Sequence, residues 1–135
     1  MTDKKPPAIV DLEWAKGLAF TARDATHTWT LDGRNVHGPS PVIALASALA
    51  GCMSIDLVAI LTKGRHEVRA LRSHLTGHRA DEDPRRFVRI ELAFELDTSA
   101  PADTVQRAID LSREKYCSVW HSMRQDIELV TTFSL

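Results

Sequence analysis

Residues 38–63, GPSPVIALASALAGCMSIDLVAILTK, decide the fold of this chain. The stretch has the start and stop signals of one long helix. Ser40 is a typical N-cap residue, and Pro41 is favoured at the first helical position because its missing N–H is not needed there. Lys63 suits the last turn, and Gly64 suits the position just beyond the end. The pattern predicts a helix from Pro41 to Lys63.

This helix is apolar on every side. Residues 41–62 carry one charged side chain, Asp56. The length would suit a membrane span. The many Ala, Ser and Gly residues and an acid near the centre argue against one, because a carboxylate is costly in lipid. A helix that is apolar all round must be covered by protein. We therefore expect it to be buried in a core completed by a second copy of the chain, a homodimer.

The segments around the helix read mainly as strands. Alternating or β-branched patterns between turn signals predict strands at 10–14, 18–22, 26–31, 68–79, 87–96 and 127–133. Pro101 opens a second helix whose apolar stripe runs to Tyr116, and further helical turns are expected within 118–124. The order of strands, helix, strands, helix and strand predicts an α+β fold. We expect residues 1–135 to form one domain.

The composition of the chain limits the classes of function to be considered. The chain has 135 residues and a formal net charge of −1, which gives no reason to expect nucleic acid or an anionic membrane as a partner. Its glycines form no phosphate loop, and its six histidines and two cysteines show no tight metal spacing, so neither cofactor nor metal is expected. Residues 1–7 lack an apolar signal region, which favours a cytoplasmic protein whose thiols start reduced.

The two cysteines, Cys52 and Cys117, are the candidates for chemistry. A thiol reacts as the thiolate, so each needs a cation or hydrogen-bond donors nearby. Within its helix, Cys52 has Asp56 at i+4, a charge of the wrong sign unless it is paired. The activating cation must come from elsewhere, and Arg23 is one candidate; the others are Arg34, His37 and Lys115.

Cys117 has more favourable neighbours along the chain. A helix starting at Ser118 would direct its first amides at the Cys117 sulfur, and His121 would lie one turn further on. His121 is also compatible with an ordinary surface histidine, and Asp56 with a structural acid. The two cysteines are 65 positions apart, and spacing alone does not bring them together. Inert cysteines and a thiol redox pair both remain open at this point.

Two motifs in this order resemble the OsmC/Ohr family. The first is Ala48-Leu49-Ala50-Gly51-Cys52 followed by Ile55-Asp56-Leu57-Val58. The second is Glu114-Lys115-Tyr116-Cys117-Ser118-Val119. The resemblance covers nearly the whole chain and is most specific between Gly38 and Val119. It implies an α+β, OsmC-like fold with two central helices enclosed by antiparallel sheets in an intertwined homodimer, and active sites at the subunit interface.

The resemblance also implies a cysteine-dependent peroxidase that reduces organic hydroperoxides in oxidative-stress defence. Cys52 would be the peroxidatic cysteine and Cys117 the resolving one, linked by a disulfide during turnover. A dithiol, such as a dihydrolipoyl protein, would be the reductant. The peroxide pocket would be apolar. Candidate lining residues are Trp14, Phe20, Met53 and Trp120, and packing in the core is the alternative for each.

One departure from the family pattern matters. Peroxidase members have a glutamate near the start of the central helix, paired with an arginine from the N-terminal region. The matching position here is Val42, or Ile43 if the register slips by one. Arg23 and Arg34 lie in the right part of the chain, but no motif fixes either as the arginine. The alternative is therefore a dimeric ligand-binding or redox-sensing protein with little peroxidase activity.

Overall fold

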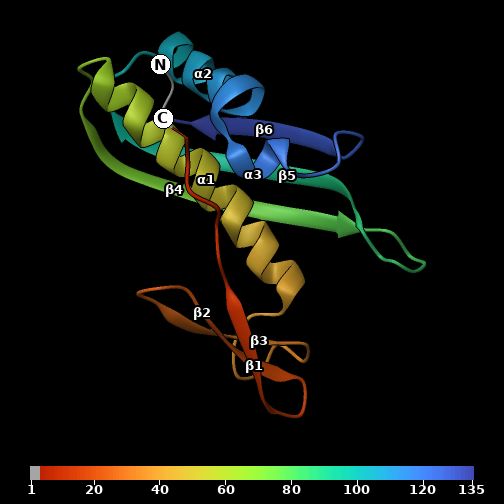
Figure 1. The fold of residues 1–135 in the computed structure, drawn as a ribbon. Coiled ribbons are helices and arrows are strands. Elements are labelled where there is room, and N and C mark those ends of the chain that lie inside the picture. The colour runs from red at the N-terminus through yellow and green to blue at the C-terminus, as the bar shows by residue number, and fades with distance from the viewer. Residues whose placement is uncertain (1–3) are drawn as a thin grey trace. The chain divides into compact units, whose positions relative to one another are not determined.

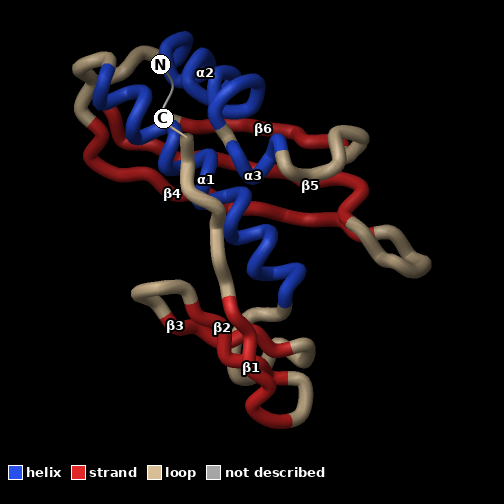
Figure 2. Tube along the Cα trace, in the orientation of Figure 1, coloured by secondary structure: helices blue, strands red, loops and turns tan. Residues whose placement is uncertain are grey.

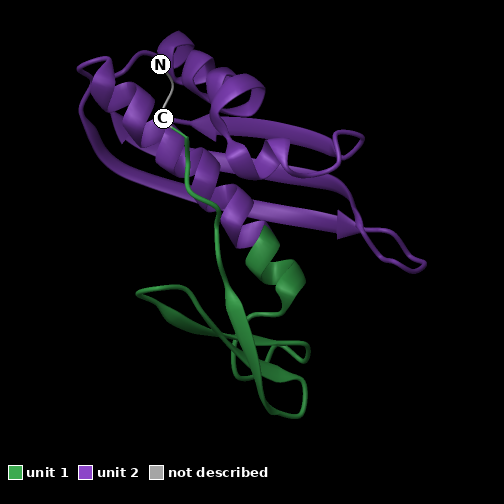
Figure 3. Ribbon diagram, viewed as in Figure 1, with its two compact units in different colours: residues 1–45 green, residues 46–135 purple. Residues whose placement is uncertain are grey.

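The structure is a computed structural model that describes residues 4–135. The chain forms two compact units, divided between residues 45 and 46 (Figure 3). Along the chain the elements follow the predicted order, with three strands before the long helix and three after it (Figure 1). The α+β class expected from the sequence is confirmed.

The N-terminal unit contains a three-stranded antiparallel sheet. Its strands are β1 (Asp11–Lys16), β2 (Ala19–Arg23) and β3 (Thr28–Asp32), in the order β1-β2-β3. Gly17 makes the turn between the first two strands at a φ of 54°, which glycine adopts without strain. Most large apolar side chains of this sheet are exposed, including Leu12, Trp14, Phe20 and Trp29.

Asp32 organises the segment that leads into the long helix. Its carboxylate accepts the backbone N–H groups of His37 and Arg34, both at 2.9 Å. These bonds, the one from His37 first, lower the pKa of Asp32. Ser40 Oγ then accepts the N–H of Ile43 at 3.3 Å. The predicted N-cap is therefore confirmed.

The long helix, α1 (Pro41–Lys63), has the predicted bounds. Within the single chain it buries one stripe, formed at every fourth position by Leu49, Met53, Leu57 and Leu61. On another face Ile55 is 69% exposed. The helix is thus not covered all round by its own chain, and the expected cover by a second copy stays a prediction. Its length and mean hydropathy of 2.1 would also suit a membrane span, a combination shared with core helices of soluble proteins.

The C-terminal unit contains a second three-stranded sheet. Its strands are β4 (Val68–Arg79), β5 (Phe87–Thr98) and β6 (Glu128–Ser134), with β5 in the centre. The antiparallel pairing expected from the family holds for β4 with β5. In contrast, β6 runs parallel to β5, with Leu129 opposite Ile90. A parallel neighbour needs a long crossover, and the segment between β5 and β6 supplies it with the second helix.

One face of this sheet forms the core of the unit. Alternate residues of β5 are almost fully buried: Ile90, Leu92, Phe94 and Leu96. The second helix, α2 (Ala102–Leu111), buries Val105, Ala108 and Ile109. The helices of this unit gather on one side of the sheet (Figures 1 and 2). Buried apolar residues recur every second position on β5 and every third to fourth position on α2, so each element has one apolar side, and the two apolar sides pack together.

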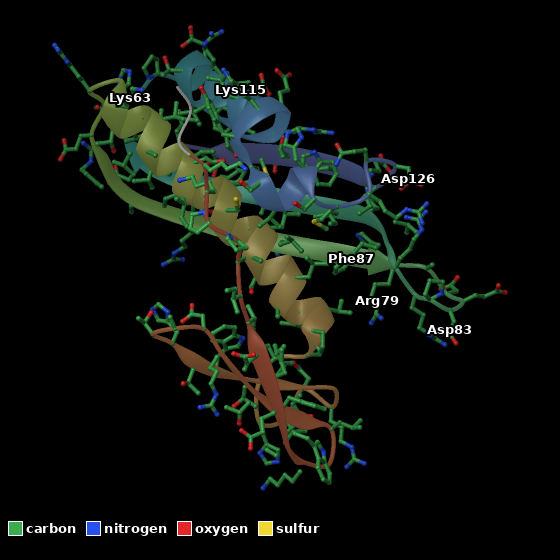
Figure 4. The ribbon with its side chains drawn as sticks, in the orientation of Figure 1. Lys63, Arg79, Asp83, Phe87, Lys115 and Asp126 are labelled. Atoms are coloured by element: carbon green, nitrogen blue, oxygen red, sulfur yellow. The ribbon has the colours of Figure 1, made fainter. Side chains whose placement is uncertain are left out.

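Gly77 on β4 provides a test of the packing in this sheet. A Cβ at this position would clash with Cε1 of Phe87, whose buried ring starts β5 (Figure 4). We expect Gly77→Ala to lower the free energy of unfolding by about 1–3 kcal/mol, because the ring must shift within a packed core. Urea denaturation measures the change.

Two further variants define the cause. The exposed neighbour variant His74→Ala should change stability by less than about 0.5 kcal/mol. In a Phe87→Leu background, the added methyl of Gly77→Ala should cost less, because the contacting ring is gone. Equal costs in the two backgrounds would contradict the steric explanation.

Candidate active site

A π-helical turn sets the position of Cys117. The α2 helix ends at Leu111 and continues as a π turn, Ser112–Tyr116, labelled η1. The N–H of Cys117 donates to the carbonyl oxygen of Ser112 at 2.8 Å, a bond that spans five residues. The wider turn places Ser112 and Cys117 on the same inner side, and neither is exposed. Such turns inside helices are frequent at functional sites.

The chain then starts a short helix, α3 (Ser118–His121), with Cys117 as its N-cap. The N–H of Trp120 donates to Cys117 Sγ at 3.3 Å. The predicted helix start after Cys117 is confirmed, with one of its first amides, that of Trp120, directed at the sulfur.

Cys117 lies beside two residues of α1. The sulfur atoms of Cys52 and Cys117 and a carboxylate oxygen of Asp56 all lie within 4.8 Å of one another. Cys52 and Asp56 are partly exposed, whereas Cys117 is fully buried. The Ser112 hydroxyl donates to Asp56 Oδ2 at 2.8 Å and so ties the π turn to α1. The fold thus brings the two cysteines together, which sequence spacing alone left open.

Burial dominates the ionisation of Cys117. Removal from water, with smaller contributions from the nearby Cys52 thiol and Asp56 carboxylate, raises the pKa of the Cys117 thiol to about 11. The hydrogen bond from the Trp120 amide acts in the opposite direction but is outweighed. The thiolate that the helix start was expected to favour is therefore not the form of Cys117 at neutral pH.

The other predicted supporting residues have different partners. Arg23 lies on β2 of the N-terminal unit, where its guanidinium is 3.6 Å from the Glu13 carboxylate. His121 lies on α3, and its Nε2 is 2.9 Å from the carbonyl oxygen of Arg113. Within residues 4–135, no carboxylate–cation pair involves Asp56 at 4.0 Å or less.

A cavity of about 500 Å³ opens beside Asp56 in the C-terminal unit. Its walls are mostly apolar, with the Lys63 side chain at the end of α1 (Figure 4). The lining residues are Asp56, Ala59, Ile60, Lys63, Gly64, Leu111 and Tyr116. None of the four predicted lining residues belongs to it. Met53 and Trp120 are packed in the core, and Trp14 and Phe20 belong to the N-terminal unit.

The lining residues that lie on α1 could have been grouped from the sequence. Asp56, Ala59, Ile60 and Lys63 follow the i, i+3, i+4, i+7 spacing of one helix face. Ser112 gave no comparable signal, because a helix of regular pitch would not place it and Cys117 on the same side.

Comparisons with known proteins cover most of the chain. Residues 32–132 match the family model described as OsmC-like protein. The chain is 36% identical over 127 residues to Protein YhfA of Escherichia coli strain K12, covering 92% of this chain and 95% of that protein.

Solved structures extend the comparison. An OsmC-like protein from Mycoplasma pneumoniae superposes with a TM-score of 0.80 at 21% identity, covering 98% of this chain and 96% of that one. An organic hydroperoxide resistance protein from Elizabethkingia anophelis gives a TM-score of 0.71 at 11% identity, covering 98% and 99%. At these identities the likeness establishes the fold.

The raised pKa of Cys117 predicts a loss of stability in alkaline solution. Folding favours the neutral thiol, so its contribution is complete below the ordinary thiol pKa of about 9 and is lost as pH rises through about 11. Over that window the native protein should lose about 2–3 kcal/mol relative to Cys117→Ser, at about 1.4 kcal/mol per pKa unit. Urea denaturation at several pH values measures both proteins. Parallel curves would contradict the prediction.

Proposed function

This chain belongs to the OsmC-like protein family, and on that basis we propose that it is a cysteine-dependent peroxidase that reduces organic hydroperoxides. The observation that carries the proposal is the meeting of two free thiols, those of Cys52 and Cys117, beside the Asp56 carboxylate. The two sulfur atoms lie within 4.8 Å of each other and would have to approach to about 2.05 Å to form the S–S bond.

The difference in exposure assigns the two roles. Cys52 is partly exposed, so a peroxide can approach its sulfur, whereas Cys117 is fully buried. The raised pKa of Cys117 also keeps this thiol neutral at physiological pH. Cys52 is therefore the proposed peroxidatic cysteine, and Cys117 the proposed resolving cysteine.

The proposed reaction runs in two steps. The Cys52 thiolate attacks the terminal oxygen of the hydroperoxide, the O–O bond breaks, and the alkoxide takes a proton and leaves as an alcohol. Cys52 is then a sulfenic acid. The Cys117 sulfur attacks this sulfur, the S–O bond breaks, and water leaves with the Cys117 proton. The peroxide has gained two electrons, and the two thiols have become a disulfide.

A dithiol of the dihydrolipoyl type is the proposed reductant. One of its thiolates attacks the Cys52–Cys117 disulfide, and its second thiol resolves the mixed disulfide, which restores both cysteines. A cytoplasmic location, where thiols are kept reduced, and a role in oxidative-stress defence complete the proposal. The Elizabethkingia relative with the same fold is named for organic hydroperoxide resistance.

A second candidate is a redox-sensing or ligand-binding protein with little peroxidase activity. The observation in its favour is the charge beside the thiols: a carboxylate at Asp56, with apolar Val42 and Ile43 near the helix start. A carboxylate opposes thiolate formation, so oxidation by peroxide would be slow. The cavity beside Asp56 would then hold an apolar ligand.

We also propose that the chain acts as a homodimer through α1. Ile55 is 69% exposed and Val58 is 41% exposed on a helix with one charged residue between Pro41 and Thr62. A surface this apolar is typical of a protein interface. A second copy of α1 would cover it with a matching surface, as symmetric dimers do.

Reaction with a hydroperoxide tests the proposed activity. Reduced protein treated with one equivalent of cumene hydroperoxide should lose two hydrogen atoms per chain and yield a Cys52–Cys117 disulfide peptide. In Cys117→Ser, a sulfenic acid on Cys52 should be trapped by dimedone. Intact mass and peptide mapping measure both results.

Cys52→Ser serves as the matched variant. It should leave Cys117 unmodified, because the buried neutral thiol is a poor nucleophile. Oxidation of Cys117 at the native rate in this variant would contradict the assigned roles. A native protein with both thiols intact after one hour would favour the second candidate.

Sedimentation tests the dimer. The native protein should sediment with the mass of two chains, and Ile55→Glu should shift it toward one chain, because a buried unpaired carboxylate is strongly destabilising at an interface. Arg107→Glu, an exposed position on α2, serves as the control and should remain dimeric. A monomeric native protein, or an unaffected Ile55→Glu variant, would contradict the proposal.

A further inference from the structure

We propose that Cys52, Asp56 and Cys117 form a binding site for a zinc(II) ion when both thiols are reduced. Their three ligand atoms lie within 4.8 Å of one another. In a tetrahedral zinc site, with Zn–S bonds of about 2.3 Å and Zn–O bonds of about 2.0–2.2 Å, the ligand atoms are roughly 3.6–3.8 Å apart. Small adjustments of the Cys52 and Asp56 side chains, both partly exposed on α1, would close the difference.

The three ligands come from two elements that are fixed to each other. Cys52 and Asp56 lie one turn apart on α1, and Cys117 follows the π turn. The Ser112 hydroxyl, fully buried, donates to Asp56 Oδ2 at 2.8 Å. The Trp120 amide donates to Cys117 Sγ at 3.3 Å. Outer partners of this kind orient metal ligands and are part of a built metal site.

The charges of the cluster favour a cation. Zinc displaces the thiol protons as it binds, so the bound ion would face two thiolates and the Asp56 carboxylate, and within residues 4–135 no ion pair reaches Asp56. Like charges at this distance repel one another strongly away from bulk water. A divalent ion replaces that repulsion by attraction. Two thiolates select zinc over magnesium and calcium, which prefer oxygen ligands.

Three protein ligands leave one coordination position open. This count is typical of reactive zinc sites, whereas structural sites use four protein ligands. Asp56 also lines the cavity of about 500 Å³, which gives water or a small molecule a path to the cluster. Water or a small molecule would take the fourth position on the proposed zinc.

Zinc binding and the disulfide exclude each other, because they use the same two sulfurs. This consequence, unlike the zinc site itself, rests on the proposed peroxidase function. A hydroperoxide takes two electrons from the two zinc-bound thiolates and, with two protons, becomes an alcohol and water. The sulfurs form the disulfide, and zinc leaves unreduced as Zn²⁺. The site would thus hold zinc when reduced and release it when oxidised.

Metal titration of the full reduced chain tests the site. Zinc(II) should bind one ion per chain in competition with a chromophoric chelator, and cobalt(II) should give the thiolate charge-transfer band expected for sulfur ligands. Cys52→Ser, Cys117→Ser and Asp56→Asn should each weaken binding by more than about tenfold. Ser112→Ala should weaken it by about 10–100-fold, because it removes an outer partner.

A matched carboxylate variant serves as the control. Asp110→Asn removes an exposed acid on α2 that accepts from Gln106, and it should leave the affinity unchanged. Circular dichroism confirms that each variant is folded, and any that unfolds is replaced by reversible alkylation of the thiols in the native chain. Binding that survives loss of either thiol, or no binding beyond that of alkylated protein, would overturn the proposal.

Treatment with a hydroperoxide distinguishes the zinc-site proposal from the peroxidase proposal. Zinc-loaded protein treated with cumene hydroperoxide should release one zinc per disulfide formed. If zinc binds as described but peroxide forms no disulfide, the peroxidase proposal fails and the zinc site stands. If a disulfide forms in a protein that never bound zinc, the zinc site fails and the peroxidase stands.

Discussion

The hydrogen bond from the Ser112 hydroxyl to the Asp56 carboxylate joins segments 56 residues apart in the chain. Both groups lie next to a cysteine: Asp56 is one helical turn beyond Cys52, and Ser112 bonds the backbone of Cys117. A buried hydroxyl that loses its acceptor costs about 1–3 kcal/mol. This bond therefore resists any sliding of α1 past the π turn, and it keeps the two sulfurs in one place.

The same hydrogen bond holds a negative charge beside the two thiols. A carboxylate held beside two thiols is the opposite of what an activated cysteine needs. In this chain the carboxylate is fixed by a neutral donor, Ser112, rather than by a cation. The cluster can consequently accept positive charge from outside, from a partner, a substrate or a metal. In a site with a glutamate–arginine pair, the arginine would already supply that positive charge.

Most of the fold could be predicted from local patterns. The caps at Ser40 and Gly64 gave the bounds of α1, and the alternation from Val88 to Leu96 gave the buried face of β5. The parallel pairing of β6 could not be read from its residues, because alternation looks the same in either direction. The exposure of Ile55 within a single chain could not be predicted either. An apolar side chain indicates that the residue is covered by protein, but not whether its own chain or another one covers it.

The candidate site was predictable only in part. The family motifs selected Cys52, Asp56 and Cys117, and the structure brings these three together. Ser112 and the cavity beside Lys63 emerged only from the structure, because both depend on how α1 and the π turn meet. The ionisation of Cys117 depends on burial from all sides, which no local motif encodes.

The π turn makes the count of residues, as well as their identity, part of the site. Each residue of an α-helix advances by about 100°. If residues 112–117 formed regular α-helical turns instead, Cys117 would lie about 140° from Ser112 around the helix, and the two residues would not share a side. With one residue fewer, the spacing would be four, which a regular helix places on one side. At the present length of this segment, the common side of Ser112 and Cys117 therefore depends on the π turn.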